Sequence, residues 1–413
     1  MIIASIVILI AIFAAAIRLP VNMGLIGFAA ALGLGVFGAG MGVKDVLAGF
    51  PADLFLTLLG ITYLFGIASR NGAIDWLVAR TAYALGTHTA FLPALVFLVA
   101  GVLTALGAVG PAAVAIVAPI ALRFARAHGF SALMMGLMAV HGAQAGSFSP
   151  VSIYGGIANK VLERSAIAPD PMFLFLASAV FNTAIALMIW AVYARRAQVA
   201  HLHLPPDAAP SPAPAPLDRD GAWTLAGLAA LAAGALVFKI DIGFMALLVI
   251  VALSIVAPRT QDGALKHVDW STILLISGIV IYVSLMEKLG TMDAAATMIA
   301  TMGSAELGVL ALCYLAGIVS AFASSTALLG VVIPLAVPLL AGSGLSPIAV
   351  VSAICIANTI VDTSPFSTNG ALIVANSPEA ERPVMLRNLI GYTAIIVGIG
   401  PLAAWGVFVG LYG

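Results

Sequence analysis

The chain has 413 residues, of which 62% are hydrophobic and only 8% are charged, with 17 basic residues against 17 acidic ones. A soluble domain usually carries about 25% charged residues, so this composition excludes a soluble globule of 42.0 kDa. The zero net charge excludes a basic nucleic-acid-binding surface. Two cysteines, Cys313 and Cys355, are too few for a disulfide framework. The remaining class is an all-α polytopic membrane protein.

In chain order, continuous apolar runs predict about ten transmembrane helices and two re-entrant hairpins. The first hairpin, residues 91–124, is interrupted at Gly107, Gly110 and Pro111, and the second, residues 306–340, at Ser324-Ser325-Thr326. At 1.5 Å per residue, each half of these runs is too short to cross a hydrocarbon core of about 30 Å. Hairpins that enter and leave on the same side therefore fit better than full crossings.

A hydrophilic segment, residues 197–221, divides the chain almost in half and is rich in proline and alanine. We expect it to be a semi-extended cytoplasmic linker. It separates residues 1–196, with five spans and a cytoplasmic-side hairpin, from residues 222–413, with five spans and an outside hairpin. With both termini outside, most lysines and arginines lie on the cytoplasmic side, as the positive-inside rule requires. We therefore expect a multi-pass protein of a bacterial inner membrane.

The two halves repeat each other in sequence. The pattern S-P-x-S-x-x-G occurs as Ser149-Pro150-Val151-Ser152-Ile153-Tyr154-Gly155 and again, 215 residues later, as Ser364-Pro365-Phe366-Ser367-Thr368-Asn369-Gly370. Gly72 and Gly290 form a further match. Because each half has an odd number of spans, the second half must be inverted relative to the first. Inverted repeats with broken helices are typical of secondary transporters.

The Ser-Pro pairs predict a helix break halfway through the membrane. Serine is a favoured N-cap and proline a favoured first helical residue, so we expect one helix to end near residue 146 and new helices to begin at Ser149 and Ser364. The N–H groups of such a helix start attract an anion, and the carbonyl groups of the preceding helix end attract a cation. Irregular backbone at this depth is tolerated only where it lines a cavity.

Asp362 is the only acidic residue that the sequence places deep in the membrane. An intramembrane carboxylate marks a functional site by default, so Asp362 is a candidate ligand of a coupling cation or a proton carrier. His141 precedes the first break, and we expect it to be a packed, hydrogen-bonded residue. No lysine or arginine falls in the predicted site, so helix ends, hydroxyl groups and bound cations must hold an anionic substrate.

The candidate site residues fall into two groups. The candidate substrate ligands lie at the hairpin tips and the two breaks: Gly110, Pro111, Ser149, Ser152, Ser324, Ser325, Thr326, Ser364 and Ser367. The candidate ligands of a coupling cation lie beside them: Gly107, Gly146, Ser147, Asp362, Thr363 and Asn369.

The segment Phe50-Pro51-Ala52-Asp53-Leu54-Phe55-Leu56-Thr57-Leu58-Leu59-Gly60, with Tyr63-Leu64-Phe65 and Asn71-Gly72 after it, resembles the start of the MatC-type malonate/dicarboxylate carriers. These carriers belong to the ion-transporter superfamily, beside the divalent-anion:sodium symporters. Those symporters have Ser-Asn-Thr at both hairpin tips, and Ser324-Ser325-Thr326 resembles that motif with one change. The first tip, Val109-Gly110-Pro111, departs from it and offers no hydroxyl group.

The resemblance implies that the hairpins and broken helices bind carboxylates and sodium ions. It also implies a homodimer of the elevator type, with a fixed scaffold and a mobile transport domain. The sequence thus predicts symport of a small carboxylate, a dicarboxylate such as malonate or a C4 acid, with sodium or alternatively a proton. No cofactor and no nucleic-acid partner are expected. A cation/proton antiporter of the same superfamily is the alternative, and an intramembrane enzyme a remote one, because no nucleophile motif accompanies His141 and Ser147.

Overall fold

The computed structural model describes residues 1–19, 21–84, 89–199, 215–291, 294, 304–322, 325–340 and 343–412, and these residues are almost entirely helical, with no strand among them. The first half contains α1 (Ile2–Arg18), α2 (Met23–Leu32), α3 (Val43–Leu47), α4 (Ala52–Arg70), α5 (Ala73–Ala84), α6 (Leu92–Ala105), α7 (Gly110–His128), α8 (Ala132–Gly146), α9 (Ile153–Arg164) and α10 (Pro171–Val199). The second half contains α11 (Arg219–Leu236), α12 (Ile242–Val256), α13 (Trp270–Lys288), α15 (Ala305–Ser320), α16 (Ser325–Leu340), α17 (Pro347–Ile360), α18 (Thr368–Asn376) and α19 (Arg382–Tyr412). An all-helical fold is therefore confirmed for the described residues.

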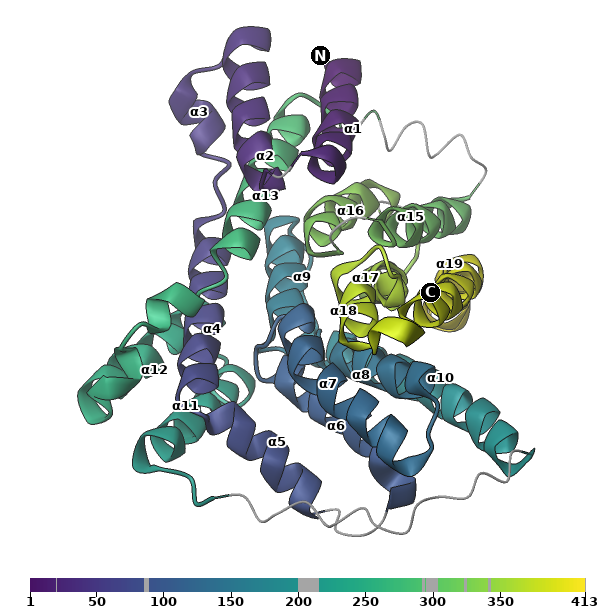
Figure 1. Cartoon of the computed structure of the whole chain (residues 1–413). Coiled ribbons are helices and arrows are strands. Elements are labelled where there is room, and N and C mark those ends of the chain that lie inside the picture. The colour runs from purple at the N-terminus through teal and green to yellow at the C-terminus, as the bar shows by residue number, and fades with distance from the viewer. Residues whose placement is uncertain are drawn as a thin grey trace.

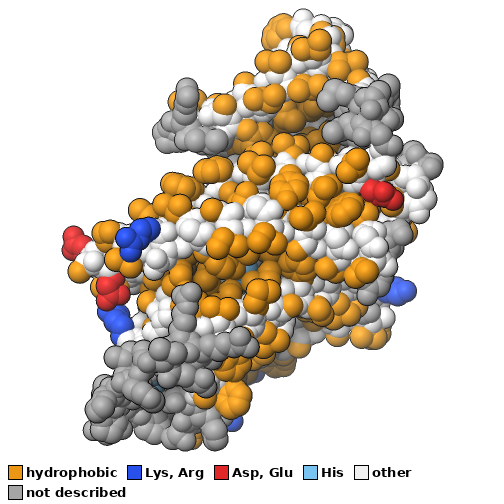
Figure 2. All heavy atoms as spheres, turned by 90° about the vertical axis from the view of Figure 1, so that its right-hand side faces the viewer, with side chains coloured by type: hydrophobic (Ala, Val, Ile, Leu, Met, Phe, Trp, Pro, Cys, Tyr) orange, Lys and Arg blue, Asp and Glu red, His pale blue; other side chains and the backbone are white. Residues whose placement is uncertain are grey.

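Within the part of the chain that the structure describes, six segments are long and apolar enough to cross a membrane: 52–70, 110–128, 171–193, 270–288, 347–376 and 379–411. Six further apolar helices among the described residues are shorter, and they include α6, α15 and α16 from the predicted hairpins. The expectation that each half of a hairpin is too short to cross is wrong for α7, whose 19 residues extend to His128 and are long enough to span the membrane. Large apolar side chains such as Val180, Met188 and Ile399 are exposed on the outer helices. Figure 2 shows one face covered by hydrophobic side chains with few charges. Since water would penalise such a surface, the protein is a multi-pass membrane protein.

The sequence repeat is matched by a repeat of helices. The hairpin helices α6 and α15 end at Ala105 and Ser320, and their partners α7 and α16 begin at Gly110 and Ser325. Both pairs are 215 residues apart, the same separation as the two S-P-x-S-x-x-G segments. Most of the predicted linker, including residues 200–214, lies outside the described residues.

Helices of one half pack on helices of the other half in exchanged pairs. Helix α2 packs against α13, and its counterpart α12 packs against α4; likewise α7 packs against α18, and α16 against α9. Figure 1 shows α4, α11 and α12 to the left and α15 to α19 to the right, with α6 to α9 between them. A two-fold relation between the halves produces such reciprocal contacts.

Glycines permit the closest helix crossings. Helices α2 and α13 cross at Gly24 and Gly278. A β-carbon on Gly24 would lie 1.9 Å from the carbonyl oxygen of Leu274, and a β-carbon on Gly278 would lie 1.9 Å from the carbonyl oxygen of Gly24. The equivalent crossing of α4 and α12 also uses a glycine, because a β-carbon on Gly243 would lie 2.8 Å from the Thr57 nitrogen. Small residues that let backbones approach are the usual device of helix packing in membranes.

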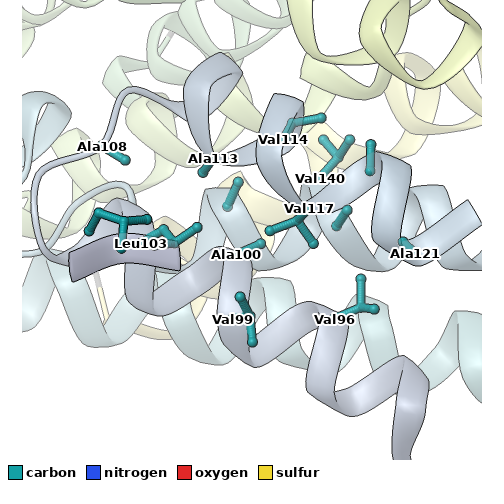
Figure 3. Packing of buried hydrophobic residues seen from close by; sticks show 14 of the residues in the cluster. Val96, Val99, Ala100, Leu103, Ala108, Ala113, Val114, Val117, Ala121 and Val140 are labelled. Atoms are coloured by element: carbon teal, nitrogen blue, oxygen red, sulfur yellow. The ribbon is translucent and has the colours of Figure 1, made fainter. Parts of the chain in front are cut away.

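Valine and alanine dominate the packing of the first hairpin against α8. Figure 3 shows Val96 and Ala100 of α6 facing Val117 and Ala121 of α7, with Val140 of α8 beside them. These side chains are at most 2% exposed. The hairpin is thus held by small apolar side chains.

We expect Gly278→Val to destabilise the fold, because the added β-carbon would overlap the α2 backbone. Overpacking costs about 1–3 kcal/mol in a well-packed core and more where only backbone can yield. The matched control is Gly406→Val in α19, where a β-carbon would meet no atom within 4 Å. Thermal unfolding midpoints in detergent should fall clearly for Gly278→Val only. Equal midpoints in the two variants would contradict the close crossing.

Candidate functional site

Both S-P-x-S-x-x-G segments interrupt a helix, and α8 ends at Gly146 as predicted. The following helices begin later than predicted, because their N-caps are Ser152 and Ser367 and not Ser149 and Ser364. The prediction that Ser149 and Ser364 start the new helices is therefore wrong.

The reason lies in the proline turn that separates the two serines. The Val151 N–H donates to Ser149 Oγ at 3.3 Å, and the Phe366 N–H donates to Ser364 Oγ at 3.2 Å. A serine that accepts from the N–H two residues later forms a local turn and cannot also cap a helix there. Each Ser-Pro pair thus makes a tight turn between two helices.

The second serine of each motif closes its turn. The Ser152 hydroxyl donates to the Ser149 carbonyl oxygen at 2.7 Å, and the Ser367 hydroxyl donates to the Ser364 carbonyl oxygen at 2.8 Å. These hydroxyl hydrogens are used within the turn. Ser152 and Ser367 therefore shape the site, and they are less suited to donate to a ligand than the sequence suggested.

The glycine of each motif is required by a backbone contact. A β-carbon on Gly155 would lie 2.0 Å from the Ser149 carbonyl oxygen, and one on Gly370 would lie 2.1 Å from that of Ser364. No side chain fits at such a distance. The short helices α9 and α18 consequently start directly against the turns that precede them.

The first hairpin tip meets the first break. The Ser149 hydroxyl donates to the Ala105 carbonyl oxygen, the last residue of α6, at 2.7 Å. Gly107 has a φ of +112°, which glycine adopts at no steric cost. A β-carbon there would lie 2.8 Å from the Ile61 side chain of α4. Gly107 thus turns the chain where the tip lies against α4.

The second hairpin tip meets the second break through a carboxylate. The Ser325 hydroxyl donates to Asp362 Oδ1, and Ser320 Oγ lies 2.5 Å from Ser325 Oγ. The Asn358 side-chain amide donates to the Ser325 carbonyl oxygen at 2.9 Å. Asp362 is only 5% exposed. This contact brings a predicted substrate ligand, Ser325, against a predicted cation ligand, Asp362.

Each tip also meets the break of the other half. The Thr326 hydroxyl donates to the Tyr154 hydroxyl oxygen at 3.5 Å, which joins α16 to α9. A β-carbon on Gly110 would lie 3.5 Å from Asn369 Nδ2, so the start of α7 lies beside α18. Two hairpin tips and two helix breaks therefore converge, as the sequence predicted.

Several buried oxygens at this centre have no hydrogen-bond partner among the described residues: Gln144 Oε1, Asn358 Oδ1, Thr363 Oγ1 and Asn369 Oδ1. The Gln144 amide nitrogen donates to the Thr359 carbonyl oxygen across the two halves at 2.7 Å. Amide, hydroxyl and carboxylate oxygens are the ligands that hard cations prefer. The oxygen types present at this centre therefore fit a hard cation.

The other candidate residues that the structure describes lie within helices or at a helix crossing. Pro111 lies in the first turn of α7, and the Ser147 hydroxyl bonds back into its own helix at 2.6 Å. A β-carbon on Gly146 would lie 2.0 Å from a backbone oxygen of α6, so this glycine serves a helix crossing. Ser324 lies outside the described residues.

His141 is packed and hydrogen-bonded, as the sequence predicted. Its ring nitrogens lie 3.0 Å from Asn182 Oδ1 and 2.6 Å from Tyr392 Oη. This network ties α8 to α10 and α19. The sequence did not single out Tyr154 as a site residue, although it occupies the same place in the motif as Asn369.

This arrangement of helices is similar to that of a transporter of known crystal structure. The Alcanivorax borkumensis YdaH transporter, whose topology is unusual, superposes with a TM-score of 0.62 at 16% sequence identity. The superposition covers 92% of this chain and 89% of that one. At this identity the likeness concerns the fold.

A search of curated proteins finds no match to this chain. Residues 1–147, however, match the family described as "Dicarboxylate carrier protein MatC N-terminus". That family and the YdaH protein are a carrier and a transporter, not enzymes. The match over residues 1–147 confirms the resemblance to MatC-type carriers that the sequence predicted.

Proposed function

We propose that the protein is a secondary active transporter that moves small dicarboxylates, such as malonate or a C4 acid, together with a cation. The observation that carries this proposal is the meeting of two hairpin tips and two helix breaks at one buried centre. Helix starts there present N–H groups to an anion without any basic side chain. The match of residues 1–147 to a dicarboxylate carrier supports the substrate class.

The hydrogen bond from Ser325 to Asp362 suggests how the cation and the substrate are coupled. While Asp362 is ionised, it occupies the Ser325 hydroxyl hydrogen and places a negative charge beside the anion site. A proton on Asp362, or a sodium ion beside it, removes that charge. The Ser325 hydroxyl is then free to donate to a substrate carboxylate. Cation binding thus favours anion binding, which is the requirement for symport.

The contacts between the two sets of helices suggest the movement. We assign α2, α4, α12 and α13 to a scaffold and the hairpins with α8, α9, α17 and α18 to a transport unit. Helix α4 packs on α9, and α13 packs on α16. If each helix takes the place of its counterpart in the other half, α4 exchanges with α13, α9 with α18 and α7 with α16. In that arrangement α7 would pack against α4, and α18 would pack against α13. We propose that these two arrangements are the two access states.

Two ion pairs hold α9 in the present arrangement. Lys160 Nζ lies 2.6 Å from Asp241 Oδ2 at the start of α12, and Arg164 pairs with Asp53 at the start of α4. All four side chains are partly exposed, so each pair contributes about 0–1 kcal/mol. Such weak contacts suit an interface that must open in every cycle.

Purified protein in proteoliposomes should accumulate radiolabelled malonate or a C4 dicarboxylate. The sodium gradient and the pH gradient are varied independently, and the gradient that drives uptake identifies the coupling ion. Empty liposomes are the control. Cation–proton exchange in the absence of any organic substrate would instead establish the antiporter, and it would contradict the proposal.

Asp362→Asn should reduce dicarboxylate uptake at least tenfold and remove its dependence on the cation, because the amide carries no charge for the cation to neutralise. The control is Asp262→Asn, which changes an exposed loop carboxylate. Initial rates are measured over a range of sodium concentration and pH. An Asp362→Asn protein with wild-type rates and unchanged ion dependence would exclude a coupling role for this residue.

A cross-link between Asp53→Cys and Arg164→Cys should stop transport, because it ties α9 to α4. A flexible bis-maleimide of about the length of the ion pair is suitable, and the native Cys313 and Cys355 are buried. The control joins Lys160→Cys to Glu163→Cys within α9 itself, which leaves α9 free to move as a unit. Full uptake after quantitative cross-linking of residues 53 and 164 would show that α9 does not leave α4.

A further inference from the structure

Tyr154 and Asn369 occupy equivalent positions in the two halves. Each immediately precedes the glycine of its S-P-x-S-x-x-G motif and is the second residue of a short helix, α9 or α18. Tyr154 is 7% exposed and Asn369 is 4% exposed. Two polar side chains thus lie at related places of the buried centre.

Each of the two side chains faces the start of a hairpin helix from the other half. The Tyr154 hydroxyl oxygen accepts from Thr326 in the first turn of α16. The Asn369 amide lies beside Gly110, the first residue of α7, where a β-carbon would be 3.5 Å from Nδ2 and 3.8 Å from Oδ1. The centre therefore has two ends, one formed by α9 with α16 and the other by α7 with α18.

The Asn369 amide makes no hydrogen bond to any residue that the structure describes. Its oxygen is buried and accepts no hydrogen bond among the described residues. The first N–H groups of α7 have no partner within the helix, and Pro111 has no N–H at all. Buried polar groups are normally satisfied, so a nine-tenths buried amide beside free N–H groups indicates a ligand.

The chemistry of the amide defines that ligand. Its NH₂ group and the N–H groups of α7 donate, which suits a carboxylate. Its oxygen accepts, which suits a hard cation that accompanies the carboxylate. At the opposite end, the Tyr154 hydroxyl accepts from Thr326 and keeps its own hydrogen to donate. Each end can thus hold one carboxylate group.

On the basis of the proposed function, we propose that Asn369 binds one carboxylate of the substrate and Tyr154 the other, so that this pair sets the preference for dicarboxylates over monocarboxylates. The first hairpin tip, which has no hydroxyl group at Gly110 and Pro111, relies on Asn369 for its side-chain donor. Asn369 therefore belongs to the substrate site as well as to the predicted cation site.

The test compares competition by dicarboxylates and by monocarboxylates of equal chain length against labelled dicarboxylate uptake. Asn369→Ala should weaken dicarboxylate competition about 10- to 100-fold, the effect of losing a hydrogen bond to a charged group. Monocarboxylate competition should change less, because such a ligand can use the other end alone. Asn369→Asp, which is nearly isosteric, should weaken dicarboxylate binding further by charge repulsion. Tyr154→Phe should act in the same direction.

The matched control is Asn376→Ala on the same helix, because the Asn376 amide already donates to the Leu372 carbonyl oxygen at 2.9 Å. This variant should keep the wild-type preference. An unchanged preference in both Asn369 variants, in protein that elutes as the wild type does, would overturn this inference while leaving the proposed transport intact. Wild-type protein that carries no dicarboxylate would overturn both.

Discussion

Backbone polar groups in an apolar surrounding must find partners, and this requirement governs the centre of the molecule. Each break exposes N–H and carbonyl groups that a continuous helix would satisfy. The Ser-Pro turns satisfy some of them locally, and the Ser149 hydroxyl satisfies one carbonyl group of the first hairpin. Four buried side-chain oxygens that have no partner among the described residues also belong to this region, on Gln144, Asn358, Thr363 and Asn369, and they are available to a solute.

Much of this arrangement could be predicted from the sequence because it depends on local chemistry. The Ser-Pro pair within the S-P-x-S-x-x-G motif predicts a break, because serine favours a turn or a helix start and proline removes a helical hydrogen bond. Proline alone does not predict one, since Pro119, Pro334 and Pro401 lie inside continuous helices. The odd number of spans in each half predicts the inversion. The position of the new helix start could not be predicted in the same way. Ser149 and Ser152 are both good N-caps by residue type, and only the turn geometry shows that Ser149 is already engaged.

Contacts between distant segments were the other part that the sequence could not supply. Nothing local relates Thr326 to Tyr154 or Gly110 to Asn369, because the residues of each pair come from different halves. The sequence repeat could have identified one further site residue. Since Tyr154 and Asn369 hold the same place in the motif, assigning one of them to the site should have led to the other.

The two-fold relation is broken at one position that matters for charge. Ser147 stands in the first half where Asp362 stands in the second, 215 residues apart. Two carboxylates at one buried centre would repel each other and the anionic substrate, and neutralising them would take two cations. A single carboxylate needs one cation for its neutralisation. The serine bonds into its own helix and carries no charge. Under the proposed function, the first half would therefore serve the anion alone and the second half both ions.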